Sequence, residues 1–279
     1  MTVHIVTDSS CDLPEEVVAE LDITIVPLTI RFGEEEFVDR VELDTEQFWA
    51  KCHASDTLPE TAAPSPGAFE QAYRDAAASG STGVVTVVLS AALSATIEAA
   101  RAGARAVEDL IPVEVIDSRS VTLGLGTLAV LAAEAARDGA DLATIRDLVT
   151  AAAPRTRVHG ALDTLDNLKK GGRIGAAQSL LGSLLSIKPL IEVRDGVVEP
   201  NGKQRTRGKA LAHLVELVRR EAADIERLAV LHAACDDVDQ LVSQLEPLVD
   251  SEILVGQVGP VVGAHAGVGT IGVVFQVRS

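Results

Sequence analysis

Aromatic residues are scarce in this sequence: Phe, Trp and Tyr make up 3% of its 279 residues, with one Trp and one Tyr. A site that stacks nucleic-acid bases on aromatic rings therefore has little to build with. Cysteine is scarce too, because Cys11, Cys52 and Cys235 are scattered and form no CxxC pair. An odd, scattered set supports neither a zinc knuckle nor a disulfide framework. The hydrophobic cores of the protein must be mainly aliphatic.

The sequence also has no excess of positive charge, because 24 Lys and Arg stand against 41 Asp and Glu, a formal net charge of -17. DNA or an anionic membrane surface would be repelled overall. The opening MTVHIVTDSS lacks the basic and apolar regions of a signal peptide, and no run of 18 apolar residues could span a membrane. We therefore expect a cytoplasmic protein with no nucleic-acid partner and no membrane-spanning segment.

Aliphatic side chains, by contrast, are abundant: hydrophobic residues reach 47%, while charged residues stay at 23%. Strand-like runs alternate with helix-like stretches along the chain, which predicts an α/β fold of sheets covered by helices. The continuous apolar run GVVTVVL at 83–89 is typical of a strand buried on both faces of a parallel sheet. Length and pattern together favour two α/β lobes with two sheets, an N-terminal lobe over 1–157 and a C-terminal lobe over 158–279.

Three stretches carry more specific structural expectations. Residues 23–32 are expected to form one further strand. Residues 57–66 are interrupted by three prolines, so they are expected to be loop. After the Gly171-Gly172 break, residues 176–185 are expected to be helical.

Hydroxyl side chains follow several predicted strands, where helices begin. Ligands of open α/β sheets bind beyond the carboxyl ends of the strands, and helix N-termini there favour anions. For any one of these hydroxyls, an N-cap that satisfies a local backbone N–H is the favoured interpretation. The groups concerned are Thr7/Ser9/Ser10, Thr61, Ser90/Ser94/Thr96 and Ser118/Ser120.

The segment 169–209 is basic within an acidic protein, because it holds nine Lys and Arg but three acids. A solvated face is the usual role of such a charge run. A site for an anion or a protein partner is the alternative, since the local field governs docking more than the net charge does.

Familiar catalytic and nucleotide motifs are missing or incomplete. GVGTIG at 267–272 fits GxGxxG, but only seven residues follow it, too few for a βαβ unit. GLGTLA at 124–129 fits a looser form but starts seven residues after Asp117, where the preceding predicted strand ends. There is no P-loop, HExxH or GxSxG, and His265 and the other histidines make no metal-spaced pair. The residues by themselves therefore predict a two-lobed α/β binding protein.

Several segments, taken in order, resemble the DegV family of fatty-acid-binding proteins. The most distinctive is LDTLDNLKKGGRIG, and the resemblance extends over residues 3–277. The other matching segments are IVTDSSCDLP, ETAAPSPGAFE, LSAALSATIEAA, VIDSRSVTLGLG, SIKPLIEVRDGVVEPNGKQRTRGKAL and GPVVGAHAGVGTIGVVF.

This resemblance implies two α/β lobes with a long-chain fatty acid, of 14 to 18 carbons, in a slot between them. The tail would lie in a pocket of the C-terminal lobe, and loops of the N-terminal lobe would bind the carboxylate. Several members of the family present the fatty acid to a separate ATP-dependent fatty-acid kinase subunit, which makes an acyl-phosphate for lipid synthesis. The resemblance thus implies a non-catalytic lipid-binding subunit without a cofactor or a metal.

Matching positions give the expected site residues. Thr61, Ser94 and His265 match the carboxylate-binding residues of the family, and Arg173 matches an arginine at the cleft and the kinase-facing surface. Arg205 lies in a segment similar to one that docks the kinase. The chain departs from the family pattern at three alanines beside the head group, Ala62, Ala63 and Ala95.

Two other functions stay open on the sequence. One is a fatty-acid carrier or sensor without a kinase partner. The other is a phosphotransferase or hydrolase that uses Asp8, Ser94 and His265.

Overall fold

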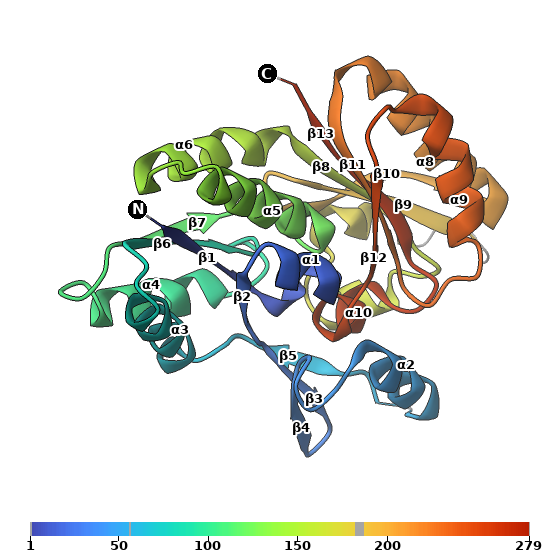
Figure 1. Cartoon of the computed structure of the whole chain (residues 1–279). Coiled ribbons are helices and arrows are strands. Elements are labelled where there is room, and N and C mark those ends of the chain that lie inside the picture. Colours follow the sequence, from blue (N-terminus) through green and yellow to red (C-terminus); the bar gives the residue numbers. More distant parts are fainter. Residues whose placement is uncertain (1, 56, 182–186, 279) are drawn as a thin grey trace.

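A four-stranded parallel sheet, in the order β2-β1-β6-β7, organises the N-terminal half of the computed structural model, which describes residues 2–55, 57–181 and 187–278 (Figure 1). Every residue of its inner strand β6 is buried, as the apolar run at 83–89 predicted. The strands are β1 (Val3–Asp8), β2 (Ile23–Val26), β6 (Gly83–Val88) and β7 (Val113–Asp117).

Helices cover both faces of this sheet, because strand side chains alternate between the two faces. Val84 and Val88 pack against α3 and α4, whereas Val85 and Val87 pack against α5 and α6. The helices are α1 (Glu15–Glu20), α3 (Pro66–Ala78), α4 (Thr96–Ala106), α5 (Leu123–Arg137) and α6 (Leu142–Ala152).

A six-stranded mixed sheet, in the order β10-β9-β8-β13-β11-β12, organises the C-terminal half. All neighbours are antiparallel except β11 and β12. Helices α8 (Arg207–Glu221) and α9 (Val238–Leu245) cover one face. The strands are β8 (Thr156–Ala161), β9 (Lys188–Arg194), β10 (Val197–Gln204), β11 (Ile225–His232), β12 (Ile253–Gln257) and β13 (Ile271–Val277).

Helix α5 lies between the two sheets and packs against both (Figure 1). One glycine on each side of α5 allows the helix backbone to lie close to the neighbouring lobe. A Cβ at Gly126 would lie 2.6 Å from the carbonyl oxygen of Cys11, and one at Gly124 would lie 2.5 Å from a methyl group of Val158. The glycines of the GLGTLA string therefore permit close packing between the lobes. The GVGTIG string likewise forms a turn, because Gly267 and Gly269 have φ of 81° and 79° between α10 (Pro260–Ala266) and β13.

A third, small antiparallel sheet of order β4-β3-β5 projects from the N-terminal lobe with α2 (Thr45–Ala54), so the expectation of two sheets was incomplete (Figure 1).

The predicted strand over 23–32 is two strands in two sheets, because Pro27 interrupts it and cannot donate a backbone hydrogen bond. The expectation that 57–66 is all loop was also wrong. Edge strand β5 lies between Pro59 and Pro64, where pairing on one side suffices. The three strands are β3 (Thr29–Phe32), β4 (Glu35–Val38) and β5 (Glu60–Ala62).

Further short elements complete the chain. Helix α7 (Asp166–Lys170) precedes η3 (Gly175–Leu180), a 3₁₀ helix where an α-helix over 176–185 was expected, and the end of that stretch lies outside the described residues. Strands β4 and β8 and helices α6 and α10 were not predicted. The remaining 3₁₀ turns are η1 (Ser9–Cys11), η2 (Ala153–Arg155), η4 (Ala222–Asp224) and η5 (Glu246–Leu248). In the part of the chain that the structure describes, no helix is long and apolar enough to cross a membrane.

Candidate functional site

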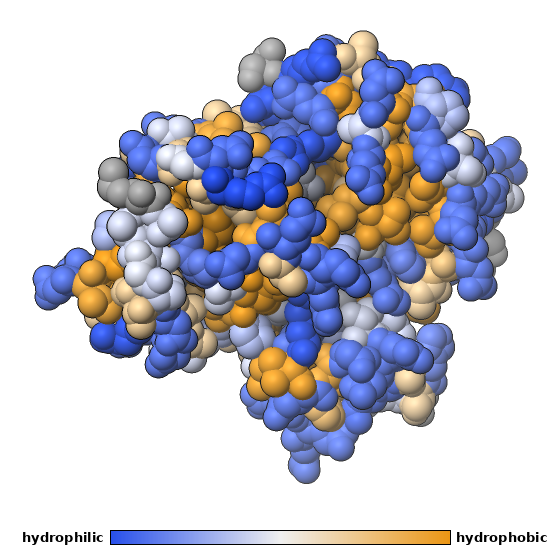
Figure 2. All heavy atoms as spheres, in the orientation of Figure 1, coloured by the Kyte–Doolittle hydropathy of each residue, from blue (hydrophilic) through white to orange (hydrophobic). Residues whose placement is uncertain are grey.

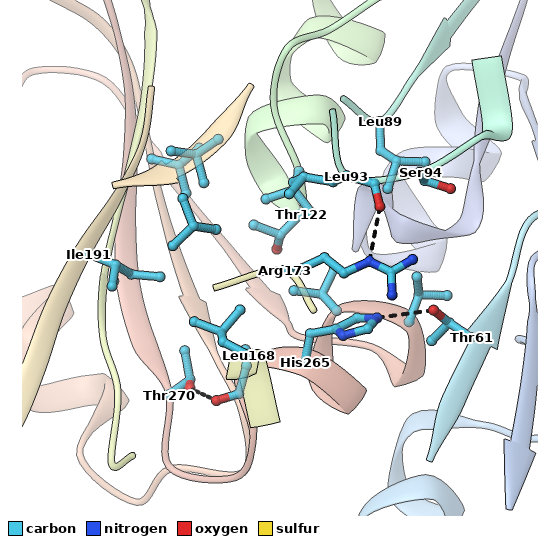
Figure 3. A pocket seen from close by; sticks show the side chains of 18 of the residues that line it. Thr61, Leu89, Leu93, Ser94, Thr122, Leu168, Arg173, Ile191, His265 and Thr270 are labelled. Atoms are coloured by element: carbon cyan, nitrogen blue, oxygen red, sulfur yellow. Dashed lines mark hydrogen bonds between the residues drawn. The ribbon is translucent and has the colours of Figure 1, made fainter. Parts of the chain in front are cut away.

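A pocket of about 230 Å³ lies between the two lobes, and most of its wall is aliphatic (Figure 3). The N-terminal lobe contributes Leu28, Thr61, Ala63, Leu89, Leu93, Ser94, Ala95, Val121 and Thr122. The C-terminal lobe contributes Val158, His159, Gly160, Leu162, Leu168, Arg173, Ile191, Val193, Val198, Leu231, Val261, Val262, His265, Ala266 and Thr270. This pocket brings together the four residues that sequence matching assigned to the ligand.

Polar groups gather at one side of the pocket. Thr61 reaches it from β5 and His265 from α10, and the Thr61 Oγ1 and His265 Nε2 atoms are 3.0 Å apart. Figure 3 shows Ile191 across the pocket from Thr61 and Ser94. Polar side chains thus gather on one side of the slot, whereas the wall around Ile191 is mostly aliphatic despite the hydroxyl of Thr270, which suits a ligand with one charged group and a long apolar tail.

The imidazole of His265 is held in its neutral form. Burial, and secondly the nearby Arg173 guanidinium, lower the pKa of His265 to about 4. Its Nδ1 is buried without a hydrogen-bond partner among the described residues. Gly171 lies against the ring, since a Cβ at that position would collide with Nδ1. The first glycine of the LKKGGRIG string thus makes room for the His265 side chain.

Arg173 links the two lobes at the polar end. Its Nε donates to the Leu93 carbonyl at 3.2 Å, and one terminal nitrogen donates to the Gly171 carbonyl at 2.5 Å. The guanidinium is partly buried and lines the pocket, so its positive charge faces the same space as Thr61 and His265. A carboxylate bound there would gain a charge-assisted partner.

Ser94 lines the pocket and also stabilises the start of α4. Its hydroxyl accepts from the Thr96 N–H at 3.3 Å and shares a 2.9 Å hydrogen bond with the Thr96 hydroxyl. Ala95 beside it is exposed. Ser94 therefore lines the pocket and supports a local turn with the same hydroxyl.

Three of the other strand-end serines make structural hydrogen bonds. Ser9 accepts from the Leu28 N–H at 3.0 Å, Ser10 donates to Asp8, and Ser90 donates to the Gly196 carbonyl at 2.7 Å. Sequence reasoning missed two hydroxyl residues in the pocket wall, Thr122 and Thr270. Thr122 precedes α5 with φ of 52°, which threonine rarely adopts, and sequence alone gives little sign of that.

The basic segment does not form one uniform surface. Lys188, Arg194 and Arg207 pair with Asp163, Glu192 and Asp237, respectively. Five exposed cations of the segment have no acid within 4.0 Å among the described residues: Lys169, Lys170, Lys203, Arg205 and Lys209. Arg205 lies between β10 and α8, outside the pocket wall.

Asp8 does not join Ser94 and His265 at the pocket. It is fully buried, accepts from the N–H groups of Ser10 and Leu89, and is not part of the pocket wall. Burial raises its pKa to about 6, and its hydrogen bonds from Ser10 and Leu89 counteract this. The triad considered for a phosphotransferase or hydrolase is therefore not assembled. Within residues 2–55, 57–181 and 187–278, no cluster of three His, Cys, Asp or Glu side chains could hold a metal ion.

A second, wider groove follows the edge strand β12 on the outer surface, with walls from α1, α5 and β11. Figure 2 shows hydrophobic atoms reaching the surface on this side of the molecule. Arginines and acids alternate with these apolar atoms, as in the Arg227–Glu134 ion pair. Because this groove mixes both signs of charge with apolar atoms, it lacks the polar-to-apolar gradient of the slot.

Comparison with known proteins gives a consistent result. The family model described as "Uncharacterised protein, DegV family" matches residues 2–278. A DegV domain-containing protein of Streptomyces coelicolor is 40% identical over 258 residues, 89% of each chain. A DegV family protein from Thermus thermophilus, described by its fatty acid binding, superposes with a TM-score of 0.91 at 30% identity, covering 100% of both chains. DegV from Bacillus subtilis, described as a fatty acid binding protein, gives 0.89 at 30% identity, again covering 100% of both chains.

Proposed function

This chain belongs to the DegV family, and from that premise we propose that it binds one long-chain fatty acid in the slot between its lobes. The carboxylate would lie at Thr61, Ser94, His265 and Arg173, and the tail would extend over the C-terminal sheet toward Ile191. The observation that supports this most strongly is a mostly aliphatic slot in which a hydroxyl, an imidazole and a guanidinium lie together on one side.

The energetics of such a complex are favourable. Burial stabilises a tail by ~0.8 kcal/mol per methylene, so a 16-carbon acid gains roughly 10 kcal/mol before ordering costs. The carboxylate can accept hydrogen bonds from two hydroxyls, an imidazole and a guanidinium, each worth more when one partner is charged. The same slot would therefore select an amphiphile with one anionic head.

We also propose that the protein presents this carboxyl group to a separate ATP-dependent kinase subunit and does not itself catalyse a reaction. Ser94 is half-buried and Ala95 is exposed, which supports a head group near the surface. Arg205, which is exposed and has no acid within 4.0 Å among the described residues, supports a docking surface for a partner. The product of the pair would be an acyl-phosphate for lipid synthesis.

Fatty-acid binding is tested by native mass spectrometry and organic extraction of the protein purified from the cells that express it. The expected result is about one fatty acid of 14 to 18 carbons per chain. A folded protein that carries no lipid and binds no added palmitate or oleate would contradict the proposal.

Presentation to a kinase is tested with radiolabelled oleate, ATP and the fatty-acid kinase subunit of the same organism, with acyl-phosphate trapped by hydroxylamine. Hydroxamate should form only when both proteins are present. Hydroxamate with this chain alone would indicate that it is the phosphotransferase. Lipid binding without any product in the complete mixture would favour a carrier or sensor.

A further inference from the structure

Two glycines face each other on neighbouring strands of the C-terminal sheet. Gly160 of β8 pairs with Gly272 of β13 in the antiparallel register. On the outer sides, Gly160 pairs with Ile191 of β9 and Gly272 pairs with Leu231 of β11. Residues paired across strands project to the same face of a sheet, so these four form one row whose two middle members have no side chain.

This row faces the slot. Ile191, Gly160 and Leu231 all belong to the pocket wall. Val158, two residues before Gly160, is on the same face and packs against α5. Strands are about 4.8 Å apart, so Ile191 and Leu231 stand roughly 14 Å apart with bare backbone between them. The sheet thus has a shallow trough across two strands.

The trough lies at the apolar end of the slot. Ile191 is across the pocket from Thr61 and Ser94 in Figure 3, and Gly160 is the direct neighbour of Ile191 in the sheet. A tail anchored by its carboxylate at the polar end would reach the trough with its terminal carbons.

The two glycines differ in what a side chain would meet. A Cβ at Gly272 would collide with the His159 carbonyl oxygen, so backbone packing requires glycine there. A Cβ at Gly160 would meet side-chain tips at ordinary contact distances, 3.4 Å from Leu162 Cδ1 and 3.6 Å from Ile191 Cγ1. Gly160 also has no left-handed φ that would demand glycine. A side chain at Gly160 therefore displaces no backbone and takes its space from the slot.

We propose that Gly160 sets the length of the acyl chain that the slot accepts, an inference that rests on the proposed binding of a fatty acid. With glycine at this position, the terminal methylenes lie against the bare sheet. A larger residue fills the trough and excludes them, while carbons nearer the carboxylate keep their contacts.

The test is a series of variants, Gly160→Ala, Gly160→Val and Gly160→Leu, titrated with saturated acids of 12, 14, 16 and 18 carbons. Each excluded methylene should reduce affinity about fourfold, the equivalent of ~0.8 kcal/mol. Gly160→Val should exclude two or three methylenes, a loss of roughly 15- to 60-fold for the 18-carbon acid and less than about threefold for the 12-carbon acid. The acids that copurify with the variant should shorten accordingly.

Gly83→Ala is the matched control. Gly83 is a buried strand glycine of β6 outside the slot, and its Cβ would also meet side-chain atoms, those of Leu142. This control should bind all four acids as the wild type does.

Circular dichroism checks that each variant is folded, and Gly160→Ala, with a shift of about one methylene, serves if the larger variants do not fold. If a folded variant keeps the wild-type chain-length profile, or loses affinity equally for all four acids, Gly160 does not set the accepted chain length. If the wild type binds none of the acids, the proposed function fails instead.

Discussion

The Thr61 hydroxyl and the His265 imidazole lie 3.0 Å apart although 204 positions separate them in the chain. Thr61 is on the edge strand of the small sheet, and His265 is on α10 of the C-terminal half. A ligand carboxylate at this place would compete for the same hydrogen-bonding groups.

Ser94→Ala should weaken fatty-acid binding about tenfold or more, because a charge-assisted hydrogen bond to a partly desolvated carboxylate is worth ~1.5–3 kcal/mol. Loss of the Ser94–Thr96 turn should also cost the ligand-free protein ~0.5–1 kcal/mol of unfolding free energy. Isothermal titration and urea unfolding measure the two effects. Ser79→Ala, which removes a 2.8 Å hydrogen bond to Ala76 away from the slot, is the control and should leave affinity unchanged. Equal affinity of both variants would place the carboxylate elsewhere.

His265 should take up a proton when a fatty acid binds. Its pKa is about 4 without ligand, and a carboxylate beside it would raise that pKa. Affinity should therefore increase as the pH falls from 7 toward 5, and His265→Gln should flatten this dependence. In the ligand-free protein the same low pKa reduces stability as the pH falls from about 6.5 toward 4, because the unfolded chain binds the proton first. NMR titration of the ring resonances measures both states, with His4 on β1 as an internal control. A ligand-independent His265 titration would contradict the prediction.

Gly171→Ala should weaken lipid binding while leaving the fold intact. The added Cβ collides with the His265 ring, which must then turn away from Thr61. We expect a loss of about tenfold in affinity, similar to removing one hydrogen bond to a charged group. Gly208→Ala, where a Cβ would meet no atom within 4 Å, is the control. Wild-type affinity in Gly171→Ala would show that the His265 position does not matter for the head group.

Asp12→Asn should stabilise the protein at pH 8. Asp12 is buried, and burial raises its pKa to about 7, although the nearby Thr122 hydroxyl and the hydrogen bond from the Gly259 N–H counteract this. The unfolded chain ionises first, so the wild type loses stability as the pH rises from about 4 to 7. Asparagine keeps an acceptor for the Gly259 N–H and avoids that loss. The free energy of unfolding should therefore increase by ~1–4 kcal/mol at pH 8, and by less toward pH 5. Urea unfolding at the two pH values measures it, and a less stable variant at pH 8 would refute this account.

Arg205→Glu should separate lipid binding from partner binding. Arg205 is exposed and outside the slot, so fatty-acid affinity should stay within about twofold of the wild type. Association with the kinase subunit should weaken, and the difference should shrink at high salt because exposed charges are screened over ~8–10 Å. Arg105→Glu makes the same charge change at an exposed position of α4 and should affect neither interaction. If lipid binding fails while the kinase still binds, Arg205 belongs to the ligand site.

The sequence predicts elements that have a regular apolar pattern better than elements that lack one. The buried strand β6 is visible as an uninterrupted apolar run, because both of its faces are covered. Strand β8 is not, because Arg157, His159 and Gly160 leave it without an apolar run. Helix α10 has only seven residues, two of them Val and one Gly, so its propensity is weak and tertiary contacts with α2 and β5 hold it.

The residues of the candidate site likewise divide into those that the sequence predicts and those that it does not. Family strings locate Thr61, Ser94, Arg173 and His265, which the structure brings to one pocket. The contribution of Thr122 depends on an unusual φ of 52°, and that of Gly160 depends on a cross-strand register. Neither property can be obtained from residue type, because both arise from how distant segments pack.

The position of α5 constrains how a lipid can enter or leave. One continuous core contains α5 together with residues of both sheets, including Val85 from one and Val274 from the other. Separating the two sheets by a rotation about α5 would expose that core to water. This exposure costs a free energy of about 25 cal/mol for each Å² of apolar surface. Exchange of the tail should therefore proceed by displacement of the rim loops that carry Leu93 and Arg173, with the lobes staying joined. Loading and unloading would then be governed by the few hydrogen bonds of that rim, and their breaking would set the residence time of the lipid.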